Sequence, residues 1–203
     1  EVLKRNPKHA NAAALIGQLA VDAFLLDEAE KIADQIDSIA SGGSENPAAS
    51  VHGSAIRARI ALRRRDPIGA EQALDAVLVR MPDQRDLLAL EAAAAAAGFR
   101  ASSTERLLNA YDQRSPGQTG ALIAVGMTLS GARQYEDAQR IFERAIELQP
   151  HWGEPRLQLG LMLVQSGDDV GAREALEQAI ELDPFNIRAQ NSLKLVRELM
   201  GYE

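Results

Sequence analysis

Few residues in this sequence could carry catalysis or hold a metal ion. The three histidines, His9, His52 and His151, stand far apart, and no His-Glu-x-x-His motif occurs. His9 and His151 each follow a proline by one or two residues, so a role in a turn is the better interpretation. The chain has no cysteine, which excludes thiolate metal sites. We therefore predict no bound metal and no cofactor.

Adjacent carboxylates are the other candidates for chemistry, because such pairs can act as a general acid and a general base. Examples are Glu136-Asp137 and Asp168-Asp169. Each pair opens a predicted helix, where the helix dipole favours negative charge, and this interpretation outweighs catalysis. The sequence also lacks a nucleophile elbow and a glycine-rich dinucleotide turn. We therefore predict that the chain is not an enzyme.

A cluster of arginines crowds the end of one predicted helix. Its members are Arg57, Arg59, Arg63, Arg64 and Arg65. In one interpretation they are solvated cations, which are favourable near a helix C-terminus. In the other interpretation, their planar guanidinium groups bind carboxylate groups of a ligand. Arg59 and Arg63, four residues apart, would then lie on one face of the helix.

Composition favours helices as the elements that position these residues. The chain has 203 residues, of which 46% are hydrophobic but only 4% aromatic, so alanine and leucine dominate the apolar content. The net charge of −7 disfavours binding to nucleic acid or to an anionic membrane. No apolar run approaches the roughly 20 residues of a membrane-spanning helix. A cysteine-free chain suits the cytoplasm and the periplasm alike, so the compartment is unknown.

One phrase of the sequence occurs twice. FERAIELQP at 142–150 and LEQAIELDP at 176–184 lie 34 residues apart, and Pro82, Pro116, Pro150 and Pro184 keep the same interval. Two columns of small residues recur with the repeat. One column contains Gly17, Ala58, Ala92, Gly126 and Gly160, and the other contains Ala29, Ala70, Thr104, Ala138 and Ala172.

These columns predict helical hairpins. Small residues allow two helices to approach closely, and a larger side chain there would overpack the contact. The predicted helices span 9–23, 27–39, 49–64, 68–80, 84–97, 103–113, 118–131, 135–148, 152–165, 169–182 and 186–199. The interval from Gly17 to Ala58 is longer than the 34-residue period. The additional residues lie near SGGSENP at 41–47, which we interpret as a loop. A phosphate-binding loop is disfavoured because no Gly-Lys-Ser/Thr follows.

The pattern resembles the tetratricopeptide repeat (TPR) family, whose period is 34 residues. The fourth copy supplies Leu122, Val125, Gly126, Leu129, Ala138, Phe142, Ala145 and Pro150, and the fifth supplies Leu159, Gly160, Leu163, Ala172, Leu176, Ala179 and Pro184. Copies two and three are degenerate, because Arg57 and Glu91 stand where a large apolar residue is expected.

The resemblance implies an all-α fold, a right-handed superhelical solenoid of antiparallel helix hairpins that forms one domain over 1–203. Five repeats are expected at about 8–47, 48–82, 83–116, 117–150 and 151–184, followed by a capping helix at 185–203. Residues 1–7 match the end of a preceding repeat, so we expect a segment of a longer, bacterial protein. The first hairpin would then be uncovered and would expose Leu15, Leu19 and Ile32.

The resemblance also implies that the first helix of each hairpin lines a concave groove, which binds a protein or peptide. By that register the expected contact residues are Gln18, Asp22, His52, Arg59, Arg63, Ile123, Met127, Leu157, Leu161 and Gln165. The Lys/Asn/Lys/Arg clamp by which some members of the family hold a C-terminal carboxylate is absent. Binding of chaperone tails is therefore not expected.

We accordingly interpret the chain as a protein–protein interaction scaffold that binds a partner segment, with no nucleic-acid partner and no membrane insertion. One alternative is the non-catalytic arm of a multidomain enzyme. The stretch FNIRAQNSLKLVRELMGYE at 185–203 looks like the segment that precedes a zinc-metallopeptidase-like domain in some long bacterial TPR proteins. Another alternative is a self-assembly module, including a homodimer through the uncovered N-terminal end.

Overall fold

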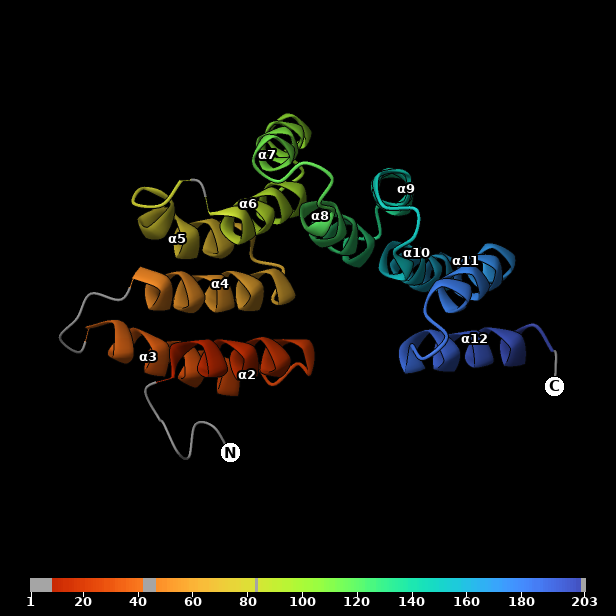
Figure 1. The fold of residues 1–203 in the computed structure, drawn as a ribbon, viewed down its shortest axis with the longest axis horizontal. Coiled ribbons are helices and arrows are strands. Elements are labelled where there is room, and N and C mark those ends of the chain that lie inside the picture. Colours follow the sequence, from red (N-terminus) through yellow and green to blue (C-terminus); the bar gives the residue numbers. More distant parts are fainter. Residues whose placement is uncertain (1–8, 42–46, 83, 202–203) are drawn as a thin grey trace. The chain divides into compact units, whose positions relative to one another are not determined.

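The computed structural model describes residues 9–41, 47–82 and 84–201, and these residues are mostly helical (Figure 1). Within these ranges eleven α-helices follow one another and no strand occurs. The helices are α2 (Ala10–Asp22), α3 (Leu26–Ser41), α4 (Pro47–Arg63), α5 (Pro67–Leu78), α6 (Arg85–Ala97), α7 (Ala101–Arg114), α8 (Gly120–Gly131), α9 (Tyr135–Leu148), α10 (Gly153–Ser166), α11 (Asp169–Leu182) and α12 (Ile187–Leu199).

Every predicted helix is present, and its ends agree with the prediction to within two residues. The all-α prediction is therefore confirmed. It succeeded because alanine-rich, leucine-rich segments separated by regularly spaced prolines and glycines have one strong local preference. The predicted loop at 41–47 falls largely on residues 42–46, which lie outside the described residues.

Consecutive helices pack against one another in pairs. α2 packs on α3, α4 on α5, α8 on α9, and α10 on α11. The first helices of successive pairs also pack together, as α2 with α4, α4 with α6, and α8 with α10. Such packing of hairpin on hairpin is the arrangement of a TPR-like solenoid. The contacts group into two compact units, Glu1–Leu107 (unit 1) and Leu108–Glu203 (unit 2), which divide within α7.

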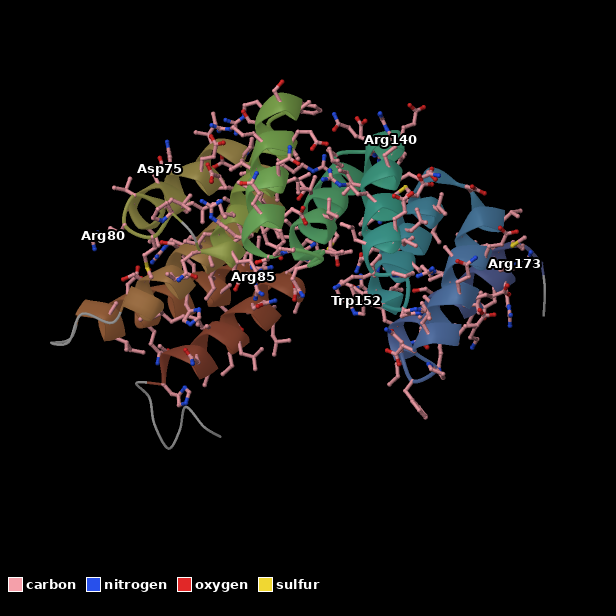
Figure 2. All side chains as sticks on the ribbon, turned by 45° about the horizontal axis from the view of Figure 1, so that its top comes forward. Asp75, Arg80, Arg85, Arg140, Trp152 and Arg173 are labelled. Carbon is pink, nitrogen blue, oxygen red and sulfur yellow. The ribbon has the colours of Figure 1, made fainter. Side chains whose placement is uncertain are left out.

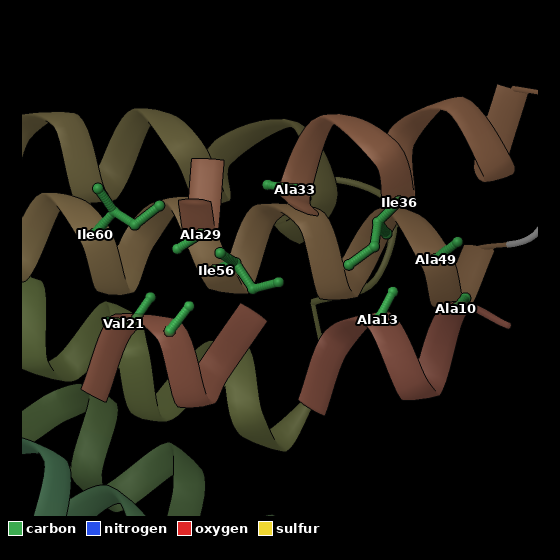
Figure 3. Close-up of a cluster of buried hydrophobic side chains, with 10 residues drawn as sticks. Ala10, Ala13, Val21, Ala29, Ala33, Ile36, Ala49, Ile56 and Ile60 are labelled. Atoms are coloured by element: carbon green, nitrogen blue, oxygen red, sulfur yellow. The ribbon is translucent and has the colours of Figure 1, made fainter. Parts of the chain in front are cut away.

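The core that α2, α3 and α4 share in unit 1 consists of alanines around a few branched side chains. Figure 3 shows Val21 from α2 and Ile36 from α3 beside Ile56 and Ile60 from α4, and each of these residues is at most 3% exposed. The alanines between them leave no bulk that would separate the helix backbones. Burial of the branched side chains therefore occurs at short distances between helix axes.

The first helix exposes leucines at positions where the next repeat buries isoleucines. Leu15 and Leu19 are 61% and 58% exposed, whereas Ile56 and Ile60 in the same columns are 3% and 2% exposed. The two isoleucines are buried because they belong to the core that α4 shares with α2 and α3. The expected exposure of the two leucines is therefore met. The expected exposure of Ile32 is wrong, because its side chain packs against the same core.

The core of unit 2 is built around leucine, valine and phenylalanine side chains. Leu157 of α10, Leu176 of α11 and Leu193 and Val196 of α12 form one buried cluster. Phe142 of α9 is 1% exposed and packs toward α8. Helix α12 thus closes the hairpin of α10 and α11, as expected of a capping helix.

The small-residue columns lie at the closest contacts between paired helices. A Cβ atom added at Gly126 would lie 2.5 Å from the Phe142 ring, and one added at Gly160 would lie 2.7 Å from the Leu176 side chain. Both distances are too short for a contact between two non-bonded carbon atoms. In the other column Ala138 is fully buried. A large side chain in these columns would force the two helices of a hairpin apart.

The turn between the two helices of each hairpin contains one residue in the left-handed conformation. These residues, with φ between 57° and 86°, are Phe24, Arg65, Phe99, Arg133 and Gly167. In each turn the following N–H reaches five residues back, as from Gln134 to the Leu129 carbonyl at 2.9 Å. This bond and the one before it form the Schellman motif that ends a helix. Four of the five turns therefore use a side chain that the left-handed region disfavours.

Side-chain caps begin several helices. Asp66 accepts a hydrogen bond from the Gly69 N–H at 2.8 Å, with Pro67 as the first helical residue. His9 caps α2 through its Nδ1 atom, which agrees with the turn role expected for it. Ser102, which has capping-box spacing in the sequence, lies inside α7.

Replacing Gly126 by leucine should destabilise unit 2 by about 1–3 kcal/mol, because the new side chain would overpack the contact with Phe142. Urea denaturation followed by far-UV circular dichroism measures this loss. Gly131→Ala is the matched control, since its added Cβ would meet no atom within 4 Å. An unchanged midpoint for Gly126→Leu would contradict the close contact between α8 and α9.

The left-handed turns predict opposite effects of two substitutions in unit 2. Arg133→Gly should raise the free energy of unfolding by about 1 kcal/mol, because glycine adopts a positive φ without the clash of a Cβ atom. Gly167→Ala should lower it by about the same amount. Thermal denaturation of the two variants beside the parent chain tests both signs. Equal shifts in one direction would contradict the assigned turn geometry.

Candidate functional site

The exposed face formed by α2 and α4 brings several predicted contact residues together. The His52 Nε2 atom lies 3.1 Å from Asn11 Oδ1, and the Arg63 guanidinium donates to Asp22 Oδ1 at 3.4 Å. The first contact joins the starts of the two helices and the second joins their ends, so α2 and α4 run in the same direction. Because the helices are parallel and in register, their outward side chains form one row, with a contact at each end.

Gln18 and Arg59 occupy the middle of this row, because they share the sequence offset of the two contacting pairs. Gln18 is exposed and Arg59 is half-buried. Among the described residues, Arg59 donates no hydrogen bond and forms no ion pair. Its guanidinium therefore retains hydrogen-bond donors that no described residue uses.

The electrostatic environment of Arg59 is mixed. Burial lowers its pKa, since the interior disfavours the charged form. The carboxylates of Asp22 and Asp86 act at longer range in the opposite direction, and the Arg63 charge adds to the lowering. Arg59 is thus a partly desolvated cation without a direct counter-ion among the described residues.

Arg63 is fixed by two contacts. Besides Asp22, its guanidinium carbon lies 4.8 Å above the centre of the Phe24 ring, a distance typical of a cation–π interaction. Phe24 lies in the left-handed turn after α2 and remains 64% exposed. The site therefore combines a fixed arginine, an aromatic surface and the unpaired Arg59. Phe24 was not predicted from the sequence, although its place in the repeating turn column could have drawn attention to it.

The arginine cluster divides between different partners. Arg57 is two residues from Arg59, which places the two side chains on opposite sides of α4. It binds three carboxylates of α3: Glu30 at 3.2 Å, Asp34 at 2.7 Å and Asp37 at 2.6 Å. These acids recur at helical spacing along the face of α3 that contacts α4. At this degenerate repeat position an ion network therefore replaces the expected apolar contact. Arg64 lies 3.6 Å from Asp27 at an exposed site.

Glu91 occupies the same repeat column as Arg57 one repeat later. Its carboxyl group is half-buried on α6, and burial raises its pKa. Arg106 of α7 opposes this rise, and Asp75 of α5 adds to it. In unit 1, both degenerate positions therefore place charged groups beside neighbouring helices.

In unit 2, four of the predicted contact residues keep some exposure. Met127 and Gln165 are exposed, and Ile123 and Leu161 are partly buried. Gln165 of α10 lies close to α8, where the Ser130 hydroxyl donates to its Oε1 atom at 3.4 Å.

The prediction of Leu157 as a contact residue is wrong. Its side chain is 1% exposed and lies in the core cluster with α11 and α12. The register of the resemblance placed this column on the groove, but in the last hairpin the column turns toward the core.

The described residues contain no group of three or more histidine, cysteine, aspartate or glutamate side chains that could hold a metal ion. In the same part of the chain, no helix has the length and apolar character needed to cross a membrane.

Residues 129–195 match the model of the tetratricopeptide repeat family. This range runs from the end of α8 into α12 and contains the whole hairpin of α10 and α11. Outside the range, α2 with α3 and α4 with α5 follow the same packing. The chain contains tetratricopeptide repeats. TPR proteins generally mediate protein–protein interactions, and this statement holds for the family as a whole.

Solved TPR structures share the fold. TTC0263, a TPR protein from Thermus thermophilus, has a TM-score of 0.62 at 14% sequence identity, covering 92% of this chain and 98% of that chain. PilW, a type IV pilus biogenesis factor, has a TM-score of 0.57 at 13% identity, covering 95% of this chain and 86% of that chain. At these identities the likeness concerns the fold alone.

Among curated proteins, the Protein CTR9 homolog of Arabidopsis thaliana is 30% identical over 128 residues. The match covers 61% of this TPR chain but 12% of that relative. The chain therefore corresponds to a small share of the relative's length.

The Arg57 network predicts a charge-dependent loss of stability. Arg57→Leu would restore the apolar residue typical of a TPR at this position but would leave three carboxylates of α3 close together. Since Arg57 is partly exposed, we expect a loss of roughly 1–2 kcal/mol at low salt and a smaller loss at high salt. Urea denaturation at two salt concentrations measures it.

The matched control is Arg80→Leu, because Arg80 follows α5 at an exposed position of the same unit (Figure 2). Its effect on the unfolding midpoint should be small at both salt concentrations. If Arg57→Leu proved as stable as the parent at low salt, the three carboxylates would not depend on the arginine.

Proposed function

We propose that this chain is a non-catalytic interaction module that binds a segment of a partner protein along the exposed face of α2, α4 and α6. The observation that carries the proposal is the row of outward polar side chains on α2 and α4. Their contacts, His52 with Asn11 and Arg63 with Asp22, hold the row in place before any partner binds. A pre-positioned surface loses less conformational entropy on binding.

The chemistry of the row supports a polypeptide ligand. It offers amide and imidazole groups, two guanidinium groups and the exposed Phe24 ring, which together can contact main-chain and side-chain groups. Parallel helices in register suit an extended or helical segment that crosses them. Arg59 and Gln18 lie at the middle of this surface.

Unit 2 offers a second, more apolar surface to the same class of partner. Met127 of α8 and Leu161 and Gln165 of α10 are the contact residues proposed there, beside Ile123. α8 and α10 pack directly on one another, so these side chains come from adjacent helices. An arm of a multidomain enzyme and a homodimer through the N-terminal end stay predictions from the sequence.

Selection of displayed random peptides of about 16 residues against the 203-residue chain tests the proposal. Enriched peptides should slow amide hydrogen exchange in α2 and α4. Gln18→Arg should block their binding, because it places a long cation in the middle of the surface.

Gln72→Arg is the matched control, since Gln72 is exposed on α5 in the same unit and the substitution adds the same charge. It should leave peptide binding unchanged. If no enriched peptide protects α2 and α4, or if the two variants bind equally well, the proposed surface is wrong.

A further inference from the structure

We propose that the segment bound by unit 1 is acidic, and that Arg59 selects it by donating paired hydrogen bonds to one aspartate or glutamate side chain. The inference rests on the proposed function and specifies the chemistry of its ligand. Arg59 would then be a specificity-determining residue of an anion-binding position between α2, α4 and α6.

The first argument is that neighbouring arginines already have partners and Arg59 does not. Arg57 binds three carboxylates of α3, and Arg63 lies between Asp22 and the Phe24 ring. Among the described residues, Arg59 forms no hydrogen bond and no ion pair. A guanidinium has five N–H donors in a fixed plane, which match the two oxygens of a carboxylate.

The second argument is that the nearby carboxylates are engaged elsewhere. Asp22 accepts from Arg63 at 3.4 Å, and Asp86 accepts from Arg85 at 3.4 Å. Both influence Arg59 only at longer range. Neither contact supplies a direct acceptor for Arg59, so an incoming carboxylate would meet donors that no described residue uses.

The third argument is the cost of leaving this charge unpaired. Arg59 is half-buried between helices, and burial lowers its pKa, which reports the penalty on its charged form. A carboxylate placed beside the guanidinium would remove much of that penalty. The pairing would also be stronger here than at a fully exposed site, because the surroundings screen it less.

The surroundings favour a single carboxylate over a phosphate or a nucleic acid. Asp22 and Asp86 lie close enough to influence Arg59, so a ligand with two negative charges would be repelled. The chain as a whole carries a net charge of −7, which opposes the approach of a polyanion. Specificity would therefore come from short-range geometry and would affect dissociation more than association.

A set of synthetic peptides of about 15 residues, acetylated and amidated at their ends, tests the inference. The set contains segments with a central glutamate, each with a twin in which glutamine replaces it. Fluorescence anisotropy measures their binding to the full chain. We expect the glutamate peptides to bind about tenfold or more tightly than their twins, and the difference to disappear in Arg59→Gln.

Two further variants separate charge, geometry and folding. Arg59→Lys keeps the charge but loses the fork, so it should retain only part of the preference for glutamate. Arg80→Gln removes the same charge from the same unit at an exposed position and should retain all of it. The melting temperature of Arg59→Gln should equal or exceed that of the parent, because a partly desolvated charge is removed.

The outcomes distinguish the two proposals. Peptides that bind α2 and α4 equally well with glutamate or glutamine would overturn the acidic ligand and leave the interaction surface standing. An unchanged preference in Arg59→Gln would overturn the role of Arg59 alone. Absence of any peptide binding to these helices would overturn both proposals. Tighter binding when phosphoserine replaces the glutamate would overturn the preference for a single carboxylate.

Discussion

The close approach of two helices within each hairpin is the constraint on which the rest of this structure depends. It holds only while the small columns stay small, since the Phe142 ring and the Leu176 side chain occupy the space that a larger residue at Gly126 or Gly160 would need. Close approach buries alanine-rich faces that would otherwise contribute little apolar area. In unit 1 the outward faces of α2 and α4 then fall into register. The row of contacts between α2 and α4 is a consequence of that register.

In unit 1, ion pairs maintain the close packing of helices at the position where the apolar residue of the repeat pattern is missing. An apolar residue at the position of Arg57 would need apolar partners, but α3 presents Glu30, Asp34 and Asp37 there. The arginine and the three acids are therefore interdependent, because removal of one side leaves like or unpaired charges near the helix contact. This arrangement also separates functions within the arginine cluster. Arg57 serves packing, whereas Arg59 on the opposite side of α4 remains available to a ligand.

The site illustrates how a helix sorts neighbouring residues of one type. Residues 57 and 59 are separated by about 200° around the helix, while residues 59 and 63 are separated by about 40°. Arg63 is held by Asp22 and Phe24, so its guanidinium already has partners within the protein. Arg59, one turn earlier on the same face, has no such partner among the described residues. The contrast between Arg59 and Arg63 supports the proposed ligand chemistry. It arises because a neighbouring helix supplies an acidic partner beside Arg63 but none in direct contact with Arg59.

The sequence by itself determined the helices, their pairing into hairpins and the small-residue contacts. These features depend on local preference and on nearest neighbours, both of which a 34-residue period records directly. Tertiary structure alone decided which partners the charged side chains have and whether a given repeat position is buried or exposed. The acids that surround Arg57 come from another helix, Leu157 turns into the core formed with α12, and the Phe24 ring reaches Arg63 across the gap between repeats. A repeat register assigns a residue to a face of its helix, but the burial and pairing of that face depend on side chains from helices distant in sequence.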